Sequence, residues 1–222
     1  MKPKTVLVET NWVVDIAAPA HLQSPQAAHL LQRADAGEFQ LFVPAVCLAE
    51  ARETIPRRFA TRTRSKDLRK FVRWARDKGK VTSGDASSAF RVLNQFDELV
   101  ADEIGKATER IDELKRHSGL TVFPLSEQML ERQVTIGAMN LSLKPYDLAI
   151  LAAVLVMAEE LQKKGYAWSG FCELDSDLQP YDRTGDIKPT LYRLYSEARI
   201  RVYGDFLLES DEGIPDEWLI PS

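Results

Sequence analysis

Short apolar runs separated by longer amphipathic stretches organise this chain. Residues 4–8, 39–43 and 120–124 are short, apolar and rich in β-branched or aromatic side chains, which predicts three buried strands. Residues 167–172 predict a fourth strand, and residues 199–203 predict a fifth at an edge of the sheet. Because helical stretches lie between these runs, we expect a three-layer α/β/α fold with a central parallel sheet of four to five strands.

Helical patterns fill the intervals between the predicted strands. One stretch runs from the end of the first strand to about Ala36, where Gly37 ends it, and Pro44 opens the next helix. Further helices are predicted over residues 126–138, 145–164 and 190–198. The helix that begins at Pro145 is apolar nearly all round, so we expect it to be buried on more than one side.

Residues 57–119 are predicted to form a helical insertion between the second and third strands. Ser65 is a candidate N-cap, Gly79 ends the first helix, and Ser118 with Gly119 ends the second. The first helix carries an apolar stripe of Leu68, Phe71, Val72 and Ala75. The second carries a longer stripe of Ala89, Leu93, Phe96, Val100, Ile104, Ala107, Ile111 and Leu114. We expect the two helices to pack as an antiparallel hairpin.

Charge is distributed unevenly along the sequence. Residues 57–80 hold 11 Lys or Arg and 2 Asp, a net charge of +9, which leaves −13 for the remainder of a chain whose total is −4. A basic block on an acidic body favours a polyanionic partner, whereas the structural alternative is a solvated helix face. Residues 205–222 form an acidic C-terminal tail that we expect to be partly disordered.

Length and composition favour a single domain over residues 1–222, with no membrane partner. No apolar run approaches the roughly 18–20 residues that a membrane helix needs. The N-terminal sequence MKPKTVLV lacks a signal-peptide pattern, so we expect a cytoplasmic protein. Cys47 and Cys172 lie in apolar segments without zinc-ligand spacing, which predicts buried free thiols.

Five carboxylates lie where a parallel sheet places its ligand-binding edge, beyond the carboxyl ends of the strands. They are Glu9 after the first strand, Glu50 in the helix after the second, Asp147 just after Pro145, and Asp175 and Asp177 after the fourth strand. Converging carboxylates repel one another unless a cation joins them, and the usual cation of an all-oxygen site is Mg²⁺ or Mn²⁺. These ions activate water and bind phosphate oxygens, so the arrangement predicts phosphodiester hydrolysis.

Each carboxylate also has a purely structural interpretation. Asp147 taken alone complements the dipole of its helix, and Glu9 taken alone suits a helix start. The two aspartates after the fourth strand suit turn positions. Glu50 suits an ion pair with a neighbouring arginine, Arg52 or Arg57. The conjunction of all five, rather than any single residue, favours the metal site.

Four segments resemble the acidic motifs of the PIN-domain family of metal-dependent nucleases. They are VLVETNWVVDI, FVPAVCLAEAR, LKPYDLAILAAV and FCELDSDLQ, in this order, and they span roughly residues 4–56 and 120–204. The resemblance implies a PIN-like fold over the chain. It also implies that Glu9, Glu50, Asp147 and Asp175 form the catalytic metal-binding set with Asp177 as a further ligand, and that Thr10 and Asn11 orient the first carboxylate or a metal-bound water.

The resemblance further implies an endoribonuclease that leaves 5′-phosphate and 3′-hydroxyl ends. Many such nucleases are toxins of bacterial toxin–antitoxin pairs, so an antitoxin protein is an implied partner. The chain departs from the family pattern at Glu9, where Asp is usual, and at Leu178, where an aromatic residue is common. The extra methylene of Glu9 moves its carboxylate outward by ~1.5 Å, and metal sites tolerate little misplacement.

Two other functions fit the same segments. A PIN-like domain that no longer cuts would be an RNA- or protein-binding module, an alternative that the Glu9 departure favours. A metal-dependent DNA nuclease would use the basic helical insertion as an arch over a strand end. Competition between single-stranded DNA and RNA separates this second alternative from an endoribonuclease.

The basic helix of the insertion is the candidate nucleic-acid contact. We expect its cationic side chains to meet phosphates and its tryptophan to stack on a base, through Arg69, Lys70, Arg73, Arg76 and Trp74. Phe71 lies on the apolar stripe and is expected in the core. An apolar surface on the insertion would also suit a homodimer.

Overall fold

The computed structural model describes residues 4–19, 22–59, 62–182 and 184–209. Its centre is a five-stranded sheet in which all neighbouring strands are parallel. The strands, in sheet order, are β3 (Leu120–Phe123), β2 (Gln40–Pro44), β1 (Thr5–Val8), β4 (Ser169–Cys172) and β5 (Ile200–Tyr203). The sheet expected from the five apolar runs is therefore confirmed, with the last run at an edge.

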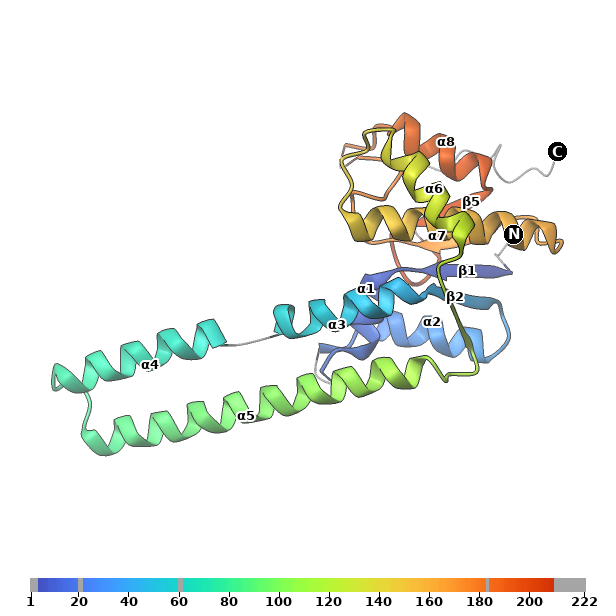
Figure 1. Cartoon of the computed structure of the whole chain (residues 1–222). Helices are drawn as coiled ribbons and strands as arrows, with labels where there is room; N and C mark the ends of the chain where they lie inside the picture. Colours follow the sequence, from blue (N-terminus) through green and yellow to red (C-terminus); the bar gives the residue numbers. More distant parts are fainter. Residues whose placement is uncertain (1–3, 20–21, 60–61, 183, 210–222) are drawn as a thin grey trace.

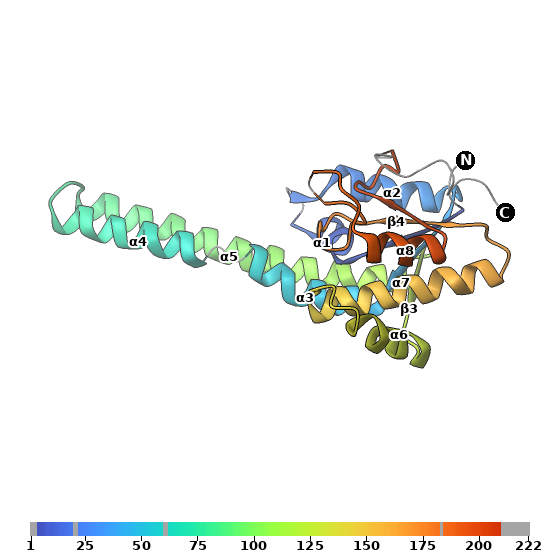
Figure 2. The ribbon, with the colours of Figure 1, turned by 90° about the horizontal axis from the view of Figure 1, so that it is seen from above.

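Helices cover both faces of this sheet. Those in the described residues are α1 (Thr10–Ala17), α2 (Pro25–Asp35), α3 (Ala45–Phe59), α4 (Arg62–Asp77), α5 (Ser83–Leu114), α6 (Glu127–Gly137), α7 (Pro145–Lys163) and α8 (Pro189–Glu197). Figure 2 shows α2 on one side of the sheet and α7 with α8 on the other. The expected three-layer α/β/α fold is therefore confirmed.

The order of the strands creates a switch point between β1 and β4. From β1 the chain moves outward through β2 to β3, and it then returns to β4 and β5 on the opposite side of β1. Right-handed crossovers therefore place the helices of the two halves on opposite faces. In open parallel sheets, ligands bind beyond the carboxyl ends of the strands at such a switch point.

The stretch between β1 and β2 is two helices rather than one. The helix α1 ends at Ala17, and α2 begins at Pro25. Ser24 caps α2 by accepting a hydrogen bond from the Ala27 N–H at 3.3 Å. The helical stretch expected up to Ala36 is therefore divided into two helices, and the second begins at Pro25 because proline has no N–H and is tolerated only in the first turn of a helix.

The helices α4 and α5 pair as the antiparallel hairpin that the sequence predicts within residues 57–119, and most of it projects from the body (Figure 1). We call α4 and residues 83–103 of α5 the arm. Gly79, whose φ of +63° suits glycine, lies in the turn between the two helices. The end of α5 returns to the body, where Ala107, Ile111 and Leu114 are buried.

Small and polar side chains take part in the contact between the two helices of the arm. Ser65 lies inside α4 rather than at its N-cap, and its hydroxyl donates to Asp97 Oδ2 at 3.3 Å. Ala75 is buried in the same contact line. Leu68 and Phe71, expected in the contact, are instead 53% and 62% exposed. The expected position of Phe71 in the core is therefore wrong, whereas Val72 and Leu93 of the two expected stripes are half-buried.

An apolar face runs along one side of the arm. Its members are Leu68, Phe71 and Trp74 on α4 and Val92, Phe96 and Leu99 on α5, all of them exposed. Because successive residues of a helix are turned by about 100°, the three residues on each helix form a stripe along it. On both helices the stripe is rotated in the same direction away from the line where α4 meets α5. In an antiparallel pair, such stripes fall on the same side. We call these six side chains the apolar face of the arm.

The core surrounds the sheet and α7. As its apolar composition predicts, α7 is buried along most of its length, from Asp147 to Leu161. Cys47 and Cys172 are buried free thiols, as expected. No helix in the described part of the chain combines the length and apolar character that crossing a membrane requires. Most of the acidic tail, residues 210–222, lies outside the described residues.

Candidate metal centre

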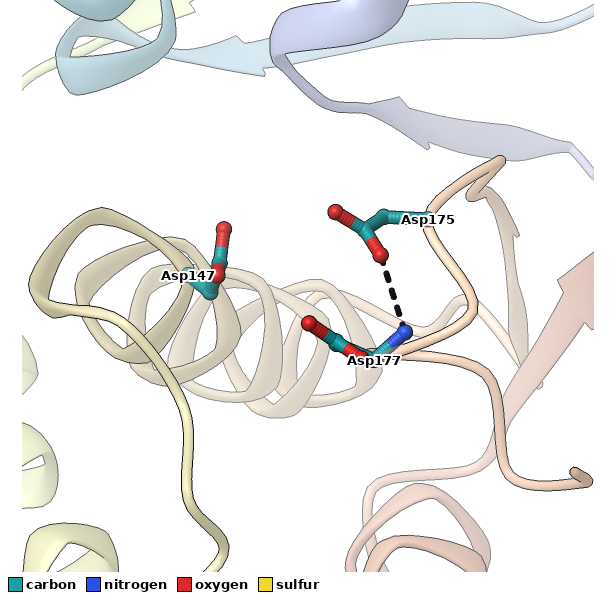
Figure 3. A group of neighbouring side chains, drawn as sticks. All are labelled: Asp147, Asp175 and Asp177. Carbon is teal, nitrogen blue, oxygen red and sulfur yellow. Dashed lines mark hydrogen bonds between the residues drawn. The ribbon is translucent and has the colours of Figure 1, made fainter.

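Three aspartates come together at the carboxyl edge of the sheet (Figure 3). Asp147 lies in the first turn of α7, and Asp175 and Asp177 lie in the loop after β4. One carboxylate oxygen from each lies within 4.8 Å of the other two. Asp175 Oδ1 also accepts a hydrogen bond from the Asp177 N–H at 2.9 Å, which fixes the turn. These carboxylates are close enough to bind one divalent ion together.

Asp147 is positioned by the start of α7. Pro145 occupies the first turn, and Lys144 precedes it as an N-cap without a side-chain hydrogen bond. The Asp147 side chain is buried, and its Oδ2 has no hydrogen-bond partner among the described residues. Burial raises the pKa of the Asp147 carboxyl, and the charge of Asp175 raises it further, while the positive charge of Lys144 lowers it in part. A carboxylate in this environment favours a nearby cation.

Glu9 links the end of β1 to the start of α1. It is the N-cap of α1, and its Oε2 accepts a hydrogen bond from the Asn11 N–H at 2.6 Å. Its other oxygen, Oε1, is buried and has no partner within the described chain. Burial is the main reason that the pKa of Glu9 rises to about 8, and the charges of Glu50 and Asp175 add to the increase. The helix-start role is therefore real, but it uses only one of the two oxygens.

Glu50 projects from α3 and is held by Thr10, whose hydroxyl donates to Glu50 Oε2 at 2.5 Å. Burial raises the pKa of Glu50, and the charge of Asp147 raises it further. The arginines considered as ion-pair partners have other contacts: Arg52 pairs with Asp112, and Arg57 donates to the Thr54 hydroxyl at 3.4 Å. Thr10 thus orients the second carboxylate, whereas the backbone of Asn11 orients the first.

Glu173 is the site residue that the sequence interpretation missed. It directly follows β4, as Glu9 follows β1, and it is fully buried. Its Oε1 accepts a hydrogen bond from the Asp175 N–H at 2.5 Å, while Oε2 has no partner in the described structure. Burial raises the pKa of Glu173 well above its usual range, and the charge of Glu9 adds to this. An acid directly after a buried strand is the signal that could have identified it, but the neighbouring Asp-x-Asp turn is the stronger motif.

The donor set suits a hard cation. Around the carboxyl edge of the sheet, Glu9, Asp147 and Glu173 each have a buried carboxylate oxygen without a hydrogen-bond partner in the described residues. An isolated buried carboxylate is strongly disfavoured, so each must bind a cation or take up a proton. The ligands that these segments offer are all oxygen atoms, which suit a hard divalent cation.

The expected nucleic-acid contacts lie on the arm, and some of them have intramolecular partners. Arg69 is ion-paired with Asp97 at 2.8 Å and turned toward α5. Arg73 lies 6.0 Å from the centre of the Phe90 ring. The remaining candidates are more exposed: Lys70 pairs with Asp67 at 3.3 Å, Arg76 pairs with Asp77 at 2.9 Å, and Trp74 is half exposed. Basic side chains are therefore available on the outside of the arm, and Arg69 contributes mainly to the hairpin contact.

Comparison of the chain with protein-family models, with curated proteins and with solved structures gives no match. Membership of the PIN-domain family therefore stays a prediction. It depends on the four acidic segments quoted above.

Proposed function

We propose that this chain is a metal-dependent endoribonuclease that hydrolyses RNA with Mg²⁺ or Mn²⁺ held by carboxylates. The observation that carries the proposal is the cluster of Asp147, Asp175 and Asp177 at the carboxyl edge of the sheet. Three further acids, Glu9, Glu50 and Glu173, lie near enough for their charges to interact with these aspartates or with one another. Three of these acids have a buried oxygen that lacks a hydrogen-bond partner in the described residues. Ionised carboxylates in such an arrangement destabilise the fold unless a cation is bound, so the arrangement supports a functional role.

The chain's own residues would position the cation and the substrate. Asp147, Asp175 and Asp177 would hold the ion, with the charges of Glu9 and Glu50 close to Asp175 and Asp147. When bound, Mg²⁺ or Mn²⁺ supplies a more acidic bound water and neutralises charge on phosphate oxygens. Because Asp177 is exposed, the substrate phosphate would approach from its side of the cluster.

Two hydrogen bonds fix the positions of carboxylates at this site. Thr10 fixes the Glu50 carboxylate, and the Asn11 N–H fixes the Glu9 carboxylate. Metal-dependent hydrolysis needs ligands held to within a fraction of an ångström, and ligands tied to helix starts and strand ends satisfy that need. The longer side chain of Glu9, compared with the aspartate usual in the resembling family, is anchored in this way.

The arm would bind the RNA backbone. Exposed cations, including Lys70 and Arg76, would contact phosphates, and Trp74 would stack on an unpaired base. RNA is preferred over DNA in this proposal because the resemblance to the PIN-domain family implies it. The projecting basic arm keeps the DNA-nuclease alternative open, since it could also pass over a DNA strand end.

The apolar face of the arm supports a protein partner. Six half-exposed side chains leave on the order of 500 Å² of apolar surface. A second copy seated on the same face would bury roughly twice that, about the lower limit of a specific interface. We therefore propose a homodimer through the arm, with a small antitoxin protein as the competing occupant of this surface.

A binding module that does not cut is the second candidate function. One observation favours it: Glu9 Oε2 is already engaged by the Asn11 N–H at 2.6 Å, so only Oε1 is free for an ion. Such a module would bind RNA through the arm but would not cleave it, whether Mn²⁺ is present or not. The discriminating observation is therefore cleavage rather than binding.

The test is incubation of a mixed-sequence, end-labelled RNA with the protein in Mn²⁺, Mg²⁺ or EDTA, with single-stranded DNA of the same sequence in parallel. The proposal expects metal-dependent RNA products with 5′-phosphate ends and slower cleavage of DNA. Faster cleavage of DNA would assign the DNA nuclease. RNA binding without products in any metal would assign the binding module.

A further inference from the structure

The arm leaves the body from the same edge of the sheet as the aspartate cluster. The helix α3 begins at Ala45, directly after β2 ends at Pro44, so it starts at the carboxyl edge. From there α3 and then α4 lead away from the body (Figure 1, Figure 2). The start of α7, which carries Asp147, contacts α3 through the Tyr146 hydroxyl, which donates to Glu53 Oε1 at 3.0 Å. The candidate centre therefore lies beside the helix that leads to the arm.

The helix α5 gives the distance from the centre to the outer part of the arm. It is continuous over 32 residues, and both α3 and α4 contact it. Arg52 of α3, two residues after Glu50, pairs with Asp112. Arg73 of α4 lies 6.0 Å from the centre of the Phe90 ring. At 1.5 Å per residue, Asp112 and Phe90 are about 33 Å apart along α5, which is therefore the distance from the level of Glu50 to the level of Arg73.

Two exposed cations lie at the inner end of this path. Arg57 is two turns beyond Glu50 on α3, and Lys144 precedes the first turn of α7. Both are exposed, and within the described residues neither takes part in a salt bridge. Burial raises the pKa of Glu50, and the charges of Arg57 and Lys144 act in the opposite direction, so both cations lie near that carboxylate. A phosphate at the centre would therefore have two cations beside it.

At the outer end, Lys66, Lys70 and Trp74 form a stripe along α4. They are spaced four residues apart, which keeps them on one side of the helix, and all three are exposed. Ser65 and Ala75 are each 4% exposed and face α5. Lys70 is five residues from each of them, which turns it about 140° away from that contact. The stripe therefore lies on the outside of the arm, where a ligand can reach it.

Cations with an aromatic ring among them are typical of surfaces that bind a single nucleic-acid strand. The cations contact the phosphates, and the ring stacks on a base. A base inside an RNA duplex has its faces covered by its neighbours, so a stacking residue such as Trp74 favours an unpaired strand. The inner cations, the outer stripe and the path along α3 therefore fit one unpaired strand better than a duplex.

We propose that one unpaired RNA strand spans the molecule, with the phosphate to be cut at the aspartate cluster and the same strand running past Arg57 to Lys70 and Trp74. This inference rests on the endoribonuclease of the proposed function and specifies its substrate class: RNA with an unpaired extension on one side of the cut. At ~3.4 Å per stacked nucleotide, about 33 Å corresponds to about ten nucleotides, and a more extended strand needs fewer.

The test measures kcat/KM for Mn²⁺-dependent cleavage of unpaired RNAs that share one cut position and are extended on either side by about 4 to about 16 nucleotides. We expect extension on one side to raise kcat/KM by about tenfold or more, up to a limit at about ten nucleotides. Extension on the other side should have little effect. A complementary strand paired with the effective extension should remove the gain.

Lys70→Ala with Trp74→Ala should lose most of the gain from extension. Arg91→Ala is the matched control, because Arg91 is an exposed arginine of α5 next to Phe90 and therefore at the same level of the arm. This control should keep the gain. Equal kcat/KM at all lengths, or a gain that survives in the double variant, would overturn the spanning strand and leave the metal-dependent cleavage of the proposed function standing.

If no RNA is cut, the affinity of the same labelled RNAs, measured by fluorescence anisotropy, separates the two claims. An affinity that rises with length up to about ten nucleotides in the wild type, but not in the double variant, would keep the spanning strand and remove the nuclease. An affinity that does not depend on length would overturn both.

Discussion

Thr10 and Glu50 are 40 residues apart in sequence, yet the Thr10 hydroxyl donates to Glu50 Oε2 at 2.5 Å. The contact joins the start of α1 to the middle of α3 at the carboxyl edge of the sheet. It therefore couples the segment that carries Glu9 to the second acid of the candidate centre.

Thr10→Val tests this coupling. Valine keeps the shape and removes the donor, so Glu50 should become free to rotate. A hydrogen bond to a charged group contributes roughly 1.5–3 kcal/mol, so we expect Mn²⁺-dependent RNA cleavage to fall about tenfold or more. Thr10→Ser, which retains the hydroxyl, is the matched control and should stay close to wild type. Equal rates for the valine and serine variants would mean that the contact does not serve the site.

The stability of the metal-free protein should depend on pH through Glu9. Its pKa of about 8 lies above the ordinary glutamate value of 4.5, mainly because of burial. The neutral form is therefore favoured in the folded state. The contribution of Glu9 to stability is fully present below about pH 4.5 and is lost as the pH rises through 8. The pKa of Glu173 is raised in the same direction.

This dependence can be measured as the melting temperature in EDTA at pH 5.5 and pH 8.5. We expect the wild type to lose more stability than Glu9→Gln over this interval, because glutamine does not ionise. Mn²⁺ at pH 8.5 should restore the wild type and have less effect on the variant. A variant with the same pH dependence as the wild type would show that Glu9 does not titrate in this range.

The basic surface of the arm should control RNA affinity without controlling chemistry. Lys70→Ala with Arg76→Ala removes two exposed cations, so RNA binding should weaken for all sequences. The slope of log K against log[salt] should become less steep, by up to about 0.7 for each phosphate of a single strand that the variant no longer neutralises. Lys164→Ala, an exposed lysine just beyond α7, is the control. An unchanged salt slope in the double variant would place the RNA elsewhere.

The apolar face of the arm should determine the oligomeric state. Phe71→Glu with Leu99→Glu places charge on both helices at positions that are 62% and 64% exposed. If the face joins two copies, light scattering should report a dimer for the wild type and a monomer for this variant. Val134→Glu on α6, which is 77% exposed, is the control and should not change the mass. A wild type that is monomeric at high concentration contradicts the homodimer.

The parts of the fold that the sequence predicts well are those with a strong local pattern. The five strands are short apolar runs, and α7 is apolar nearly all round. The pattern of apolar residues alone is therefore enough to identify these elements in the sequence. The break between α1 and α2 is hidden from periodicity because the apolar spacing continues across Pro25. Proline is a stronger signal than periodicity at that position.

The contact surface of the arm could not be predicted from periodicity alone. Both a narrow line of Ser65 and Ala75 and a wider apolar stripe fit the spacing of α4, and the choice depends on Asp97, which lies 32 residues beyond Ser65 in the chain. Glu173 illustrates a related limit. Its importance comes from lying next to Glu9 across two strands that are far apart in sequence. Only the strand order, with β4 beside β1, brings the two acids together.

The measurement that tests the central claim most directly is Mn²⁺-dependent RNA cleavage by Asp147→Asn. Asparagine keeps the size of the side chain but cannot supply a charged ligand, so we expect cleavage to fall by at least about a hundredfold while the protein stays folded. Asp85→Asn is the matched control, because Asp85 also lies in the first turn of a helix, α5, but outside the cluster. Loss of cleavage in Asp147→Asn alone is the result that the account predicts. Full activity in Asp147→Asn, or no metal-dependent cleavage by the wild type, would contradict it.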